Sequence, residues 1–209
     1  MPAPFTRAQL LGFRGARVDD LIADPLRLLF VGINPGLWTA AVNTHFARLG
    51  NRFWPALFLA GITQREVIAG AGLTRADRDL LLHLGIGITN LVPYATARAD
   101  ELTQAQIRAG VGPLIQLVGR TSPRVVAMLG ITAYRQAFGQ PGATTGRQGI
   151  RLQGAELWVL PNPSGLNAHE TVRSLACAYR AAAEAAGLVL PPRHGDAPPS
   201  PIQGPSPTA

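Results

Sequence analysis

Short apolar runs alternate with helical patterns along most of the chain. The apolar runs predict four buried strands, at Leu26–Ile33, Ile86–Val92, Arg124–Leu129 and Leu157–Leu160. Between and after them, apolar residues recur at helical spacing and predict helices at about Arg52–Ala60, Arg75–Leu84, Gln104–Val118, Thr132–Phe138 and Ala168–Ala186. This alternation predicts a three-layer α/β/α domain with a central, mainly parallel four-stranded sheet.

Polar residues at two helix starts sharpen the expected boundaries. Thr103 with Gln106, and Asn167 with Glu170, have the spacing of capping boxes. Ahead of the last strand, Gly149–Ala155 is a candidate hairpin arm.

The two ends of the chain depart from this pattern. Residues 1–25 read as a partly helical N-terminal extension, with one short helix around Thr6–Phe13 and another before Pro25. We expect the α/β domain to span 26–187. From Gly187 onward lie seven of the 18 prolines, and such a segment buries too little apolar surface to offset its ordering entropy. We therefore expect a flexible tail over 188–209, ordered at most through Leu188–Leu190.

Composition excludes several kinds of chemistry. All 19 basic residues are arginine, so lysine-dependent P-loops and lysine imines are absent. The single cysteine, Cys177, excludes an internal disulfide and a four-cysteine cluster. No HExxH spacing joins the four histidines, which are His45, His83, His169 and His194. We expect no metal, no cofactor and, without an apolar run of about 20 residues or a signal peptide, a cytoplasmic protein outside the membrane.

The net charge of +7 changes the expected partner. A fixed surplus of arginine attracts polyanions, nucleic acid first. A GC-rich coding sequence would produce the same surplus, so charge alone leaves both explanations open.

Two predicted strands end in related turns, Gly32–Gly36 (GINPG) and Pro161–Asn167 (PNPSGLN). Each has an asparagine before proline, which holds that asparagine extended, and glycines that allow close approach of the backbone. Either turn alone is also explained as an ordinary tight turn. Ligands of open α/β sheets bind beyond the carboxyl ends of the strands, so the pair predicts a shared crevice.

Three blocks resemble one family: GINPGLW at 32–38, HFARLGNRFW at 45–54 and LPNPSGLN at 160–167. In order and spacing they are similar to the mismatch-specific uracil-DNA glycosylase/thymine-DNA glycosylase family, part of the uracil-DNA glycosylase superfamily, over roughly 26–186. The resemblance implies a glycosylase-like fold. It also implies an enzyme that flips uracil or a related damaged pyrimidine, paired with guanine, out of double-stranded DNA and hydrolyses its N-glycosidic bond, leaving an abasic site.

The resemblance assigns roles within the first two blocks. Asn34 would position the attacking water, and the backbone of Ile33 would contact the pyrimidine. Phe46 would stack on the flipped base, although a core phenylalanine is the alternative. Asn51 would cap a helix and support the pocket.

The third block would contact DNA. Gly165 and Leu166 match a wedge that fills the space left by the flipped nucleotide, and the backbone near Gly165 would contact the widowed guanine. Ser164, and backbone N–H groups following Asn167, would lie near phosphates. The family arginine after the wedge is replaced by Ala168; either His169 compensates or the grip on the opposite strand is weaker.

A separate hypothesis concerns Asp100, in the irregular loop after the second strand. Thr103 already caps the next helix, so Asp100, or less favourably Glu101, is a candidate to assist water activation. A surface aspartate preceding a helix is the alternative.

The favoured function is therefore a monofunctional, monomeric glycosylase, because no lysine is available to form an imine and nick the strand. Two alternatives stay open. One is a non-catalytic protein that binds mismatches or lesions, and the other is a small-molecule nucleotide hydrolase, which would have no use for Leu166.

Overall fold

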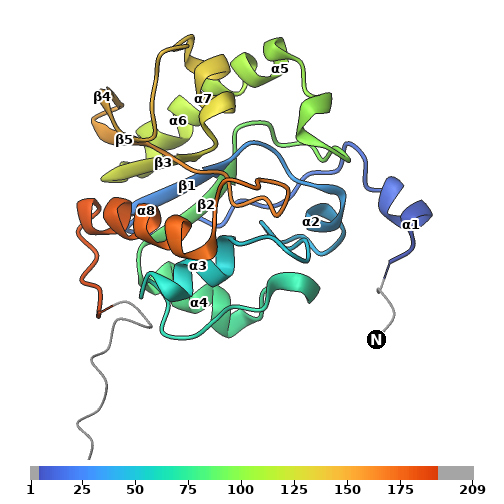
Figure 1. Ribbon diagram of the computed structural model, residues 1–209, viewed down its shortest axis with the longest axis horizontal. Helices are drawn as coiled ribbons and strands as arrows, with labels where there is room; N and C mark the ends of the chain where they lie inside the picture. Colours follow the sequence, from blue (N-terminus) through green and yellow to red (C-terminus); the bar gives the residue numbers. More distant parts are fainter. Residues whose placement is uncertain (1–4, 193–209) are drawn as a thin grey trace, which may run out of the picture.

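The computed structural model describes residues 5–192. Within them a five-stranded sheet forms the middle layer, in the order β2-β1-β3-β5-β4 (Figure 1). Four strands are parallel, and β4 runs antiparallel to β5. The strands are β1 (Leu28–Gly32), β2 (Ile86–Asn90), β3 (Val125–Leu129), β4 (Gly146–Leu152) and β5 (Ala155–Leu160). The predicted α/β class is confirmed, but the sheet has five strands and not four.

The additional strand belongs to a hairpin. The predicted arm, Gly149–Ala155, is displaced: β4 begins at Gly146, and the turn lies at Gln153 and Gly154, with φ angles of 49° and 88°. Two successive positive φ angles are typical of two-residue hairpin turns. Most of β4 is exposed or half-buried, so it has no apolar run that would reveal a strand.

Helices cover both faces of the sheet. Leu28 and Phe30 of β1 face a core shared with α3, α4 and α8, whereas Leu29 and Val31 face a core shared with α5, α6 and α7 (Figure 1). A strand buried on both faces is apolar throughout, which explains why β1 and β3 were readable from the sequence. The helices are α3 (Phe53–Leu59), α4 (Arg75–His83), α5 (Gln104–Ala109), α6 (Val111–Thr121), α7 (Ile131–Phe138) and α8 (Val172–Ala185).

The helix predicted over Gln104–Val118 is two helices, α5 and α6, that meet at Gly110. Pro113 gives the reason, because it has no N–H for the carbonyl of Ala109 and its ring would clash there in a continuous helix. In the first turn of α6 neither penalty arises. The predicted capping box of α5 is confirmed: Thr103 Oγ1 accepts from Gln106 N at 3.2 Å, and Thr103 N donates to Gln106 Oε1 at 2.8 Å.

The last helix starts later than predicted, at Val172, with Thr171 as its cap. The predicted capping box of Asn167 with Glu170 is wrong. The side chain of Asn167 instead donates to the backbone oxygen of Asn162 at 3.1 Å, which closes the preceding loop on itself. The segment after β5 is therefore a longer irregular loop, 161–171, which begins at the carboxyl end of that strand.

The N-terminal segment packs along the outer side of β2. The predicted first helix is present as α1 (Arg7–Leu11), but no helix forms in the stretch before Pro25. Leu21 there forms an antiparallel bridge with Ile88 of β2. This pairing needs extended backbone, which excludes a helix at that point.

Three short helices complete the described elements, namely α2 (Leu37–Ala41), η1 (Ala69–Ala71) and η2 (Ala99–Glu101). After α8, Leu188 is buried and Leu190 is partly buried against the core. The expected tail lies outside the described residues from 193 onward. Within 5–192, no helix combines the length and apolarity needed to cross a bilayer.

Candidate functional site

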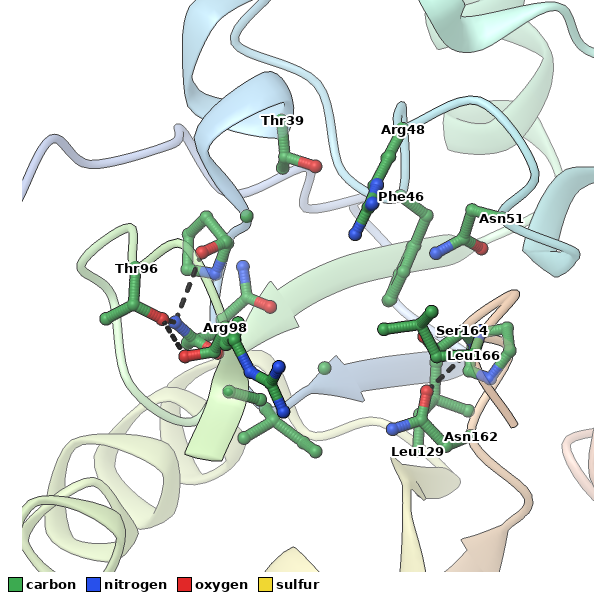
Figure 2. Close-up of a pocket in the computed structure, with 18 of the residues that line it drawn as sticks. Thr39, Phe46, Arg48, Asn51, Thr96, Arg98, Leu129, Asn162, Ser164 and Leu166 are labelled. Atoms are coloured by element: carbon green, nitrogen blue, oxygen red, sulfur yellow. Dashed lines mark hydrogen bonds between the residues drawn. The ribbon is translucent and has the colours of Figure 1, made fainter. Parts of the chain in front are cut away.

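The two predicted loops meet at the carboxyl ends of the parallel strands. β1 and β5 both run parallel to β3, so their carboxyl ends lie on the same side. A cleft of about 300 Å³ lies between the loops that follow them (Figure 2). Residues 46–51 and 96–100 complete its walls. Seven predicted site residues line it: Ile33, Asn34, Phe46, Asn51, Asp100, Ser164 and Leu166.

The carboxamide of Asn34 is held in one orientation. Its Nδ2 donates to Thr96 Oγ1 at 2.7 Å, to the Pro35 carbonyl at 3.1 Å and to the Tyr94 carbonyl at 3.3 Å. Backbone carbonyls only accept, so the nitrogen must face them. Among the described residues none donates to the amide oxygen, so this atom stays available as a hydrogen-bond acceptor.

Phe46 forms an apolar wall of the cleft. Its ring stacks on Phe53 with centroids 4.2 Å apart, and its own φ of 55° is rare for an aromatic residue. A Cβ on Gly32 would lie 3.1 Å from the ring and would collide with Asn90 Oδ1. Phe46 thus both packs against the core and lines the cleft, and only glycine at position 32 permits the arrangement.

Asn90 was not predicted, yet its side chain lines the cleft beside Gly32. Its Nδ2 lies 3.1 Å from Nδ1 of His45, and Nε2 of His45 lies 3.1 Å from the carbonyl of Asp19. Burial lowers the pKa of His45 to about 4, so the ring is neutral at pH 7. Asn90 could have been identified from the sequence, because it is a polar residue at the end of the apolar run IGITN. Nothing in the sequence indicates its contact with His45.

The loop after β5 is fastened to the start of α3 by Arg52, which was not singled out either. The guanidinium of Arg52 donates to the carbonyls of Ser164, Glu170 and, at 2.7 Å, Asn167. Its backbone N donates to the carbonyl of Pro163 at 2.9 Å. Four hydrogen bonds from one residue thus join this loop to the start of α3.

Leu166 protrudes from that loop, with 77% of its surface exposed. Gly165, beside it, approaches the backbone of Gly50 so closely that a Cβ would lie 2.6 Å from the Gly50 oxygen. Figure 2 shows Leu166 beside Ser164 and Asn162 at the side of the cleft. The loop therefore carries an exposed apolar side chain on a tightly packed base.

The remaining predicted residues of the third block lie outside the cleft. Asn167 is turned into its own loop, as described above, and His169 is exposed beyond it. Asn51 lines the cleft, but the predicted cap of the helix is wrong: the N-cap of α3 is Arg52. Asn51 lies one position earlier, and its Oδ1 accepts from Phe53 N at 2.9 Å.

Charged groups flank the opening. Arg98 holds both oxygens of Asp100 at 2.6–3.1 Å. Hydrogen bonding from Arg98 keeps the pKa of Asp100 below its ordinary value. The hypothesis that Asp100 assists the attack of water stays a prediction, and this ion pair is the argument against it. Arg48 also lines the cleft, and within 5–192 no side chain or backbone group pairs with its guanidinium.

The part of the chain that is described contains no cluster of three or more histidine, cysteine or carboxylate groups arranged to hold a metal ion. The donors at the cleft are instead amides, hydroxyls and guanidinium groups. Such a set suits hydrogen bonding to an uncharged polar ring and to phosphates.

Comparison with known proteins agrees with the fold. A solution NMR structure of a candidate uracil DNA glycosylase from Methanosarcina acetivorans covers 83% of this chain and 98% of its own, at 15% identity and a TM-score of 0.53, and so shares the fold. Residues 20–185 match the profile of the uracil DNA glycosylase superfamily, which supports a DNA glycosylase activity. This chain, with an amide-lined cleft between two strand-end loops, belongs to the uracil DNA glycosylase superfamily.

Proposed function

We propose that the protein is a monofunctional DNA glycosylase that removes uracil, and related damaged pyrimidines, from mispairs with guanine in duplex DNA. One observation carries the proposal. The amide oxygen of Asn34, the ring of Phe46 and the exposed Leu166 surround a single cleft. Superfamily membership supports DNA glycosylase activity in general.

A flipped base would enter between Phe46 and Asn90. The ring of Phe46 offers a stacking face, and Ile33 lines the same cleft, where its backbone would contact the base. The carboxamide of Asn90 offers a donor and an acceptor to the pyrimidine edge. The cleft lies in the size range of small-molecule sites, which suits one extruded nucleotide.

The chemistry follows from the lack of a strong base on Asn34. An amide orients water by accepting its hydrogen bond, but it does not take a proton. The C1′–N1 bond therefore breaks first, and its electron pair leaves with the base as an anion. Water then adds to C1′ of the cationic sugar and loses a proton to solvent, while the base regains one. Without lysine no imine forms, so the product is an abasic site in an intact strand.

Leu166 would fill the gap in the base stack, and the backbone near Gly165 would face the widowed guanine. Ser164, Asn167, His169 and the unpaired Arg48 would lie along the phosphates. Arg48 would supply the positively charged contact to DNA that Ala168 cannot make. We propose that a monomer performs all of these steps.

A single-turnover assay tests the function. Labelled duplexes with uracil:guanine, uracil:adenine or thymine:guanine are incubated with excess protein, treated with alkali and separated by size. We expect alkali-labile strands from uracil:guanine. Asn34→Ala should slow excision about 100-fold or more, the scale seen when one positioned catalytic group is lost, with duplex affinity kept.

Gln104→Ala, an exposed amide outside the cleft, is the matched control and should behave as the unaltered protein. Binding of the mispaired duplex without any alkali-labile product would reject the enzyme in favour of a non-catalytic lesion-binding protein. Excision from free nucleotides at the same rate as from duplex would favour the nucleotide hydrolase.

A further inference from the structure

A second apolar side chain protrudes beside the cleft. Leu49 has 72% of its surface exposed, nearly as much as Leu166. Arg48 before it and Asn51 after it both line the cleft, so Leu49 lies at the rim. Exposed leucines are common on protein surfaces, and exposure alone assigns Leu49 no role.

Leu49 occupies the corner of a tight turn. The backbone N of Asn51 donates to the carbonyl of Arg48 at 2.9 Å, which closes a four-residue turn with Leu49 and Gly50 at its centre. Gly50 has a φ of 80°, which glycine readily adopts at the third position of such a turn. Proline is the residue that favours the second position, so formation of the turn does not depend on a leucine there.

The side chain of Leu49 rests on a fixed base. Its Cδ2 lies 3.6 Å from the position that a Cβ on Gly70 would take. The carbonyl of Gly70 accepts from Trp38 Nε1 at 2.9 Å, which ties this base to α2. An apolar group supported in this way loses little conformational freedom when a partner covers it.

Leu49 and Leu166 are carried by loops that touch each other. A Cβ on Gly165 would lie 2.6 Å from the backbone oxygen of Gly50. Leu166 directly follows Gly165, and Leu49 directly precedes Gly50, so the two exposed leucines flank this contact. They therefore lie on the same side of the cleft.

The charge of both loops favours an anionic partner. Residues 25–65, which include Leu49, contain no aspartate or glutamate. Residues 157–169, which include Leu166, contain none either. Arg48 adds a guanidinium at the cleft that has no partner within 5–192. Exposed leucines beside a free cation suit duplex DNA, which combines anionic phosphates with an apolar base stack.

We propose that Leu49 is a second wedge, which enters the duplex beside Leu166 and packs against the base pair next to the vacated position. The inference rests on the proposed function, because it assumes that DNA with a flipped nucleotide occupies the cleft. Flipping leaves an opening between two base pairs. Two neighbouring leucines cover more of that apolar opening than one and keep the step apart.

A wedge differs from a phosphate contact in what it binds. It buries apolar surface only where the base stack is open, and it releases no counterions. Leu49 should therefore add affinity for a duplex with a vacated position but not for an intact duplex, and the salt dependence of binding should not change.

Affinity measurements over a range of salt concentrations test this expectation. The probes are a duplex with a tetrahydrofuran abasic analogue opposite guanine and the same duplex without a lesion. Leu49→Ala should bind the abasic duplex about tenfold more weakly, because burial of a leucine side chain is worth about that factor or more. It should bind the intact duplex as the unaltered protein does. Leu49→Met, which keeps an apolar side chain of similar volume, should restore the affinity.

Ile150→Ala is the matched control, since Ile150 is 44% exposed on β4 and does not line the cleft. Both of its affinities should be unaltered. An unchanged ratio of the two affinities in Leu49→Ala overturns the proposal, and so does an equal loss for both duplexes. If Leu49→Ala changes only self-association in sedimentation, the surface joins copies of this chain, and the second wedge is rejected.

Cross-linking tests where Leu49 lies on the DNA. Leu49→Cys is combined with Cys177→Ser, which removes the single cysteine of the chain. Duplexes carry an activated disulfide on a base that is either next to the abasic analogue or a full helical turn away. We expect cross-links to the adjacent base alone, and none from Ile150→Cys in the same background. A complex that cross-links only at the distant base, or at neither, overturns the proposal.

Failure of the second wedge is distinguishable from failure of the proposed function. If the unaltered protein excises uracil but the Leu49 variants give the contrary results, the second wedge alone is rejected. If the unaltered protein neither binds the abasic duplex nor excises uracil, the proposed function fails and the second wedge fails with it.

Discussion

Nδ2 of Asn34 lies 2.7 Å from the hydroxyl oxygen of Thr96, whose hydrogen is donated to the carbonyl of Arg98 at 2.7 Å. The hydroxyl therefore accepts from Asn34 because its only hydrogen is already used. Through this chain the loop after β2 decides which end of the Asn34 amide faces the cleft.

Replacing that hydroxyl tests the relationship. Thr96→Val keeps the shape but removes the acceptor, so we expect single-turnover excision of uracil to slow about tenfold, the value of one hydrogen bond. Duplex affinity should stay within about twofold, because Thr96 orients Asn34 and does not bind DNA. Thr145→Val, exposed ahead of β4, is the control. A loss of affinity with unchanged cleavage would contradict this assignment.

Arg52 should contribute strongly to stability. Arg52→Met keeps the aliphatic stem but leaves three backbone carbonyls of the 161–171 loop without their donor. At about 1 kcal/mol for each lost bond, the free energy of unfolding should fall by about 2–4 kcal/mol in urea titrations. Arg108→Met, which removes one exposed contact of 3.3 Å, should cost far less. Equal losses of stability in the two variants would show that the three hydrogen bonds of Arg52 stabilise the fold no more than the single contact of Arg108.

Leu166 should act on base flipping and not on folding. Because the side chain is 77% exposed, Leu166→Ala should leave the melting temperature unchanged. Fluorescence of 2-aminopurine next to uracil should report fewer flipped bases, and excision should slow about tenfold, since nothing then opposes restacking worth a few kcal/mol. Ile150→Ala on β4, 44% exposed, is the control. Unaltered flipping in Leu166→Ala would remove the wedge from the mechanism.

One variant of Asp100 separates the predicted role in water activation from the role in binding that its ion pair with Arg98 favours. Its carboxylate is bound by Arg98, and 62% of the side chain is exposed. Asp100→Asn should keep the single-turnover rate but free a cation at the cleft, so duplex affinity at low salt should rise and its salt dependence should steepen by about one phosphate contact. A large loss of rate would instead support the role in water activation.

The lowered pKa of His45 should make the stability of the protein depend on pH. Burial lowers its pKa from 6.5 to about 4, so the unfolded chain binds the proton more readily than the folded one. Its contribution is full above pH 6.5 and is lost as the pH falls toward 4, a change of roughly 3 kcal/mol at 1.36 kcal/mol per pKa unit. The charged groups that act on the ring are Asp19 and Arg78.

Urea titrations between pH 7 and 4 check this dependence. In His45→Gln the decline over that interval should be smaller by the stated amount, because glutamine does not titrate. Parallel curves for the two proteins would mean that His45 is not kept neutral by burial.

Much of the fold was readable from local patterns. The runs that became β1 and β3 are buried on both faces and apolar throughout, and β2 departs from this pattern only at Thr89 and Asn90. The strand-end turns follow directly from proline and glycine chemistry. Because the strands are parallel, both turns lie at the carboxyl ends of the strands, on the same side of the sheet. This explains why Asn34 and Leu166 could be assigned to a common cleft.

The sequence alone determined the α/β class, the two loops and seven residues that line the cleft, but it did not reveal Asn90. Tertiary structure alone decided how those residues are held: Arg52 reaches a loop 112 positions away, and His45 joins Asp19 to Asn90. Periodicity reports burial, which is a property of one element. A polar contact between two elements depends on the positions of both side chains in the folded protein. The sequence around either residue carries no information about those positions.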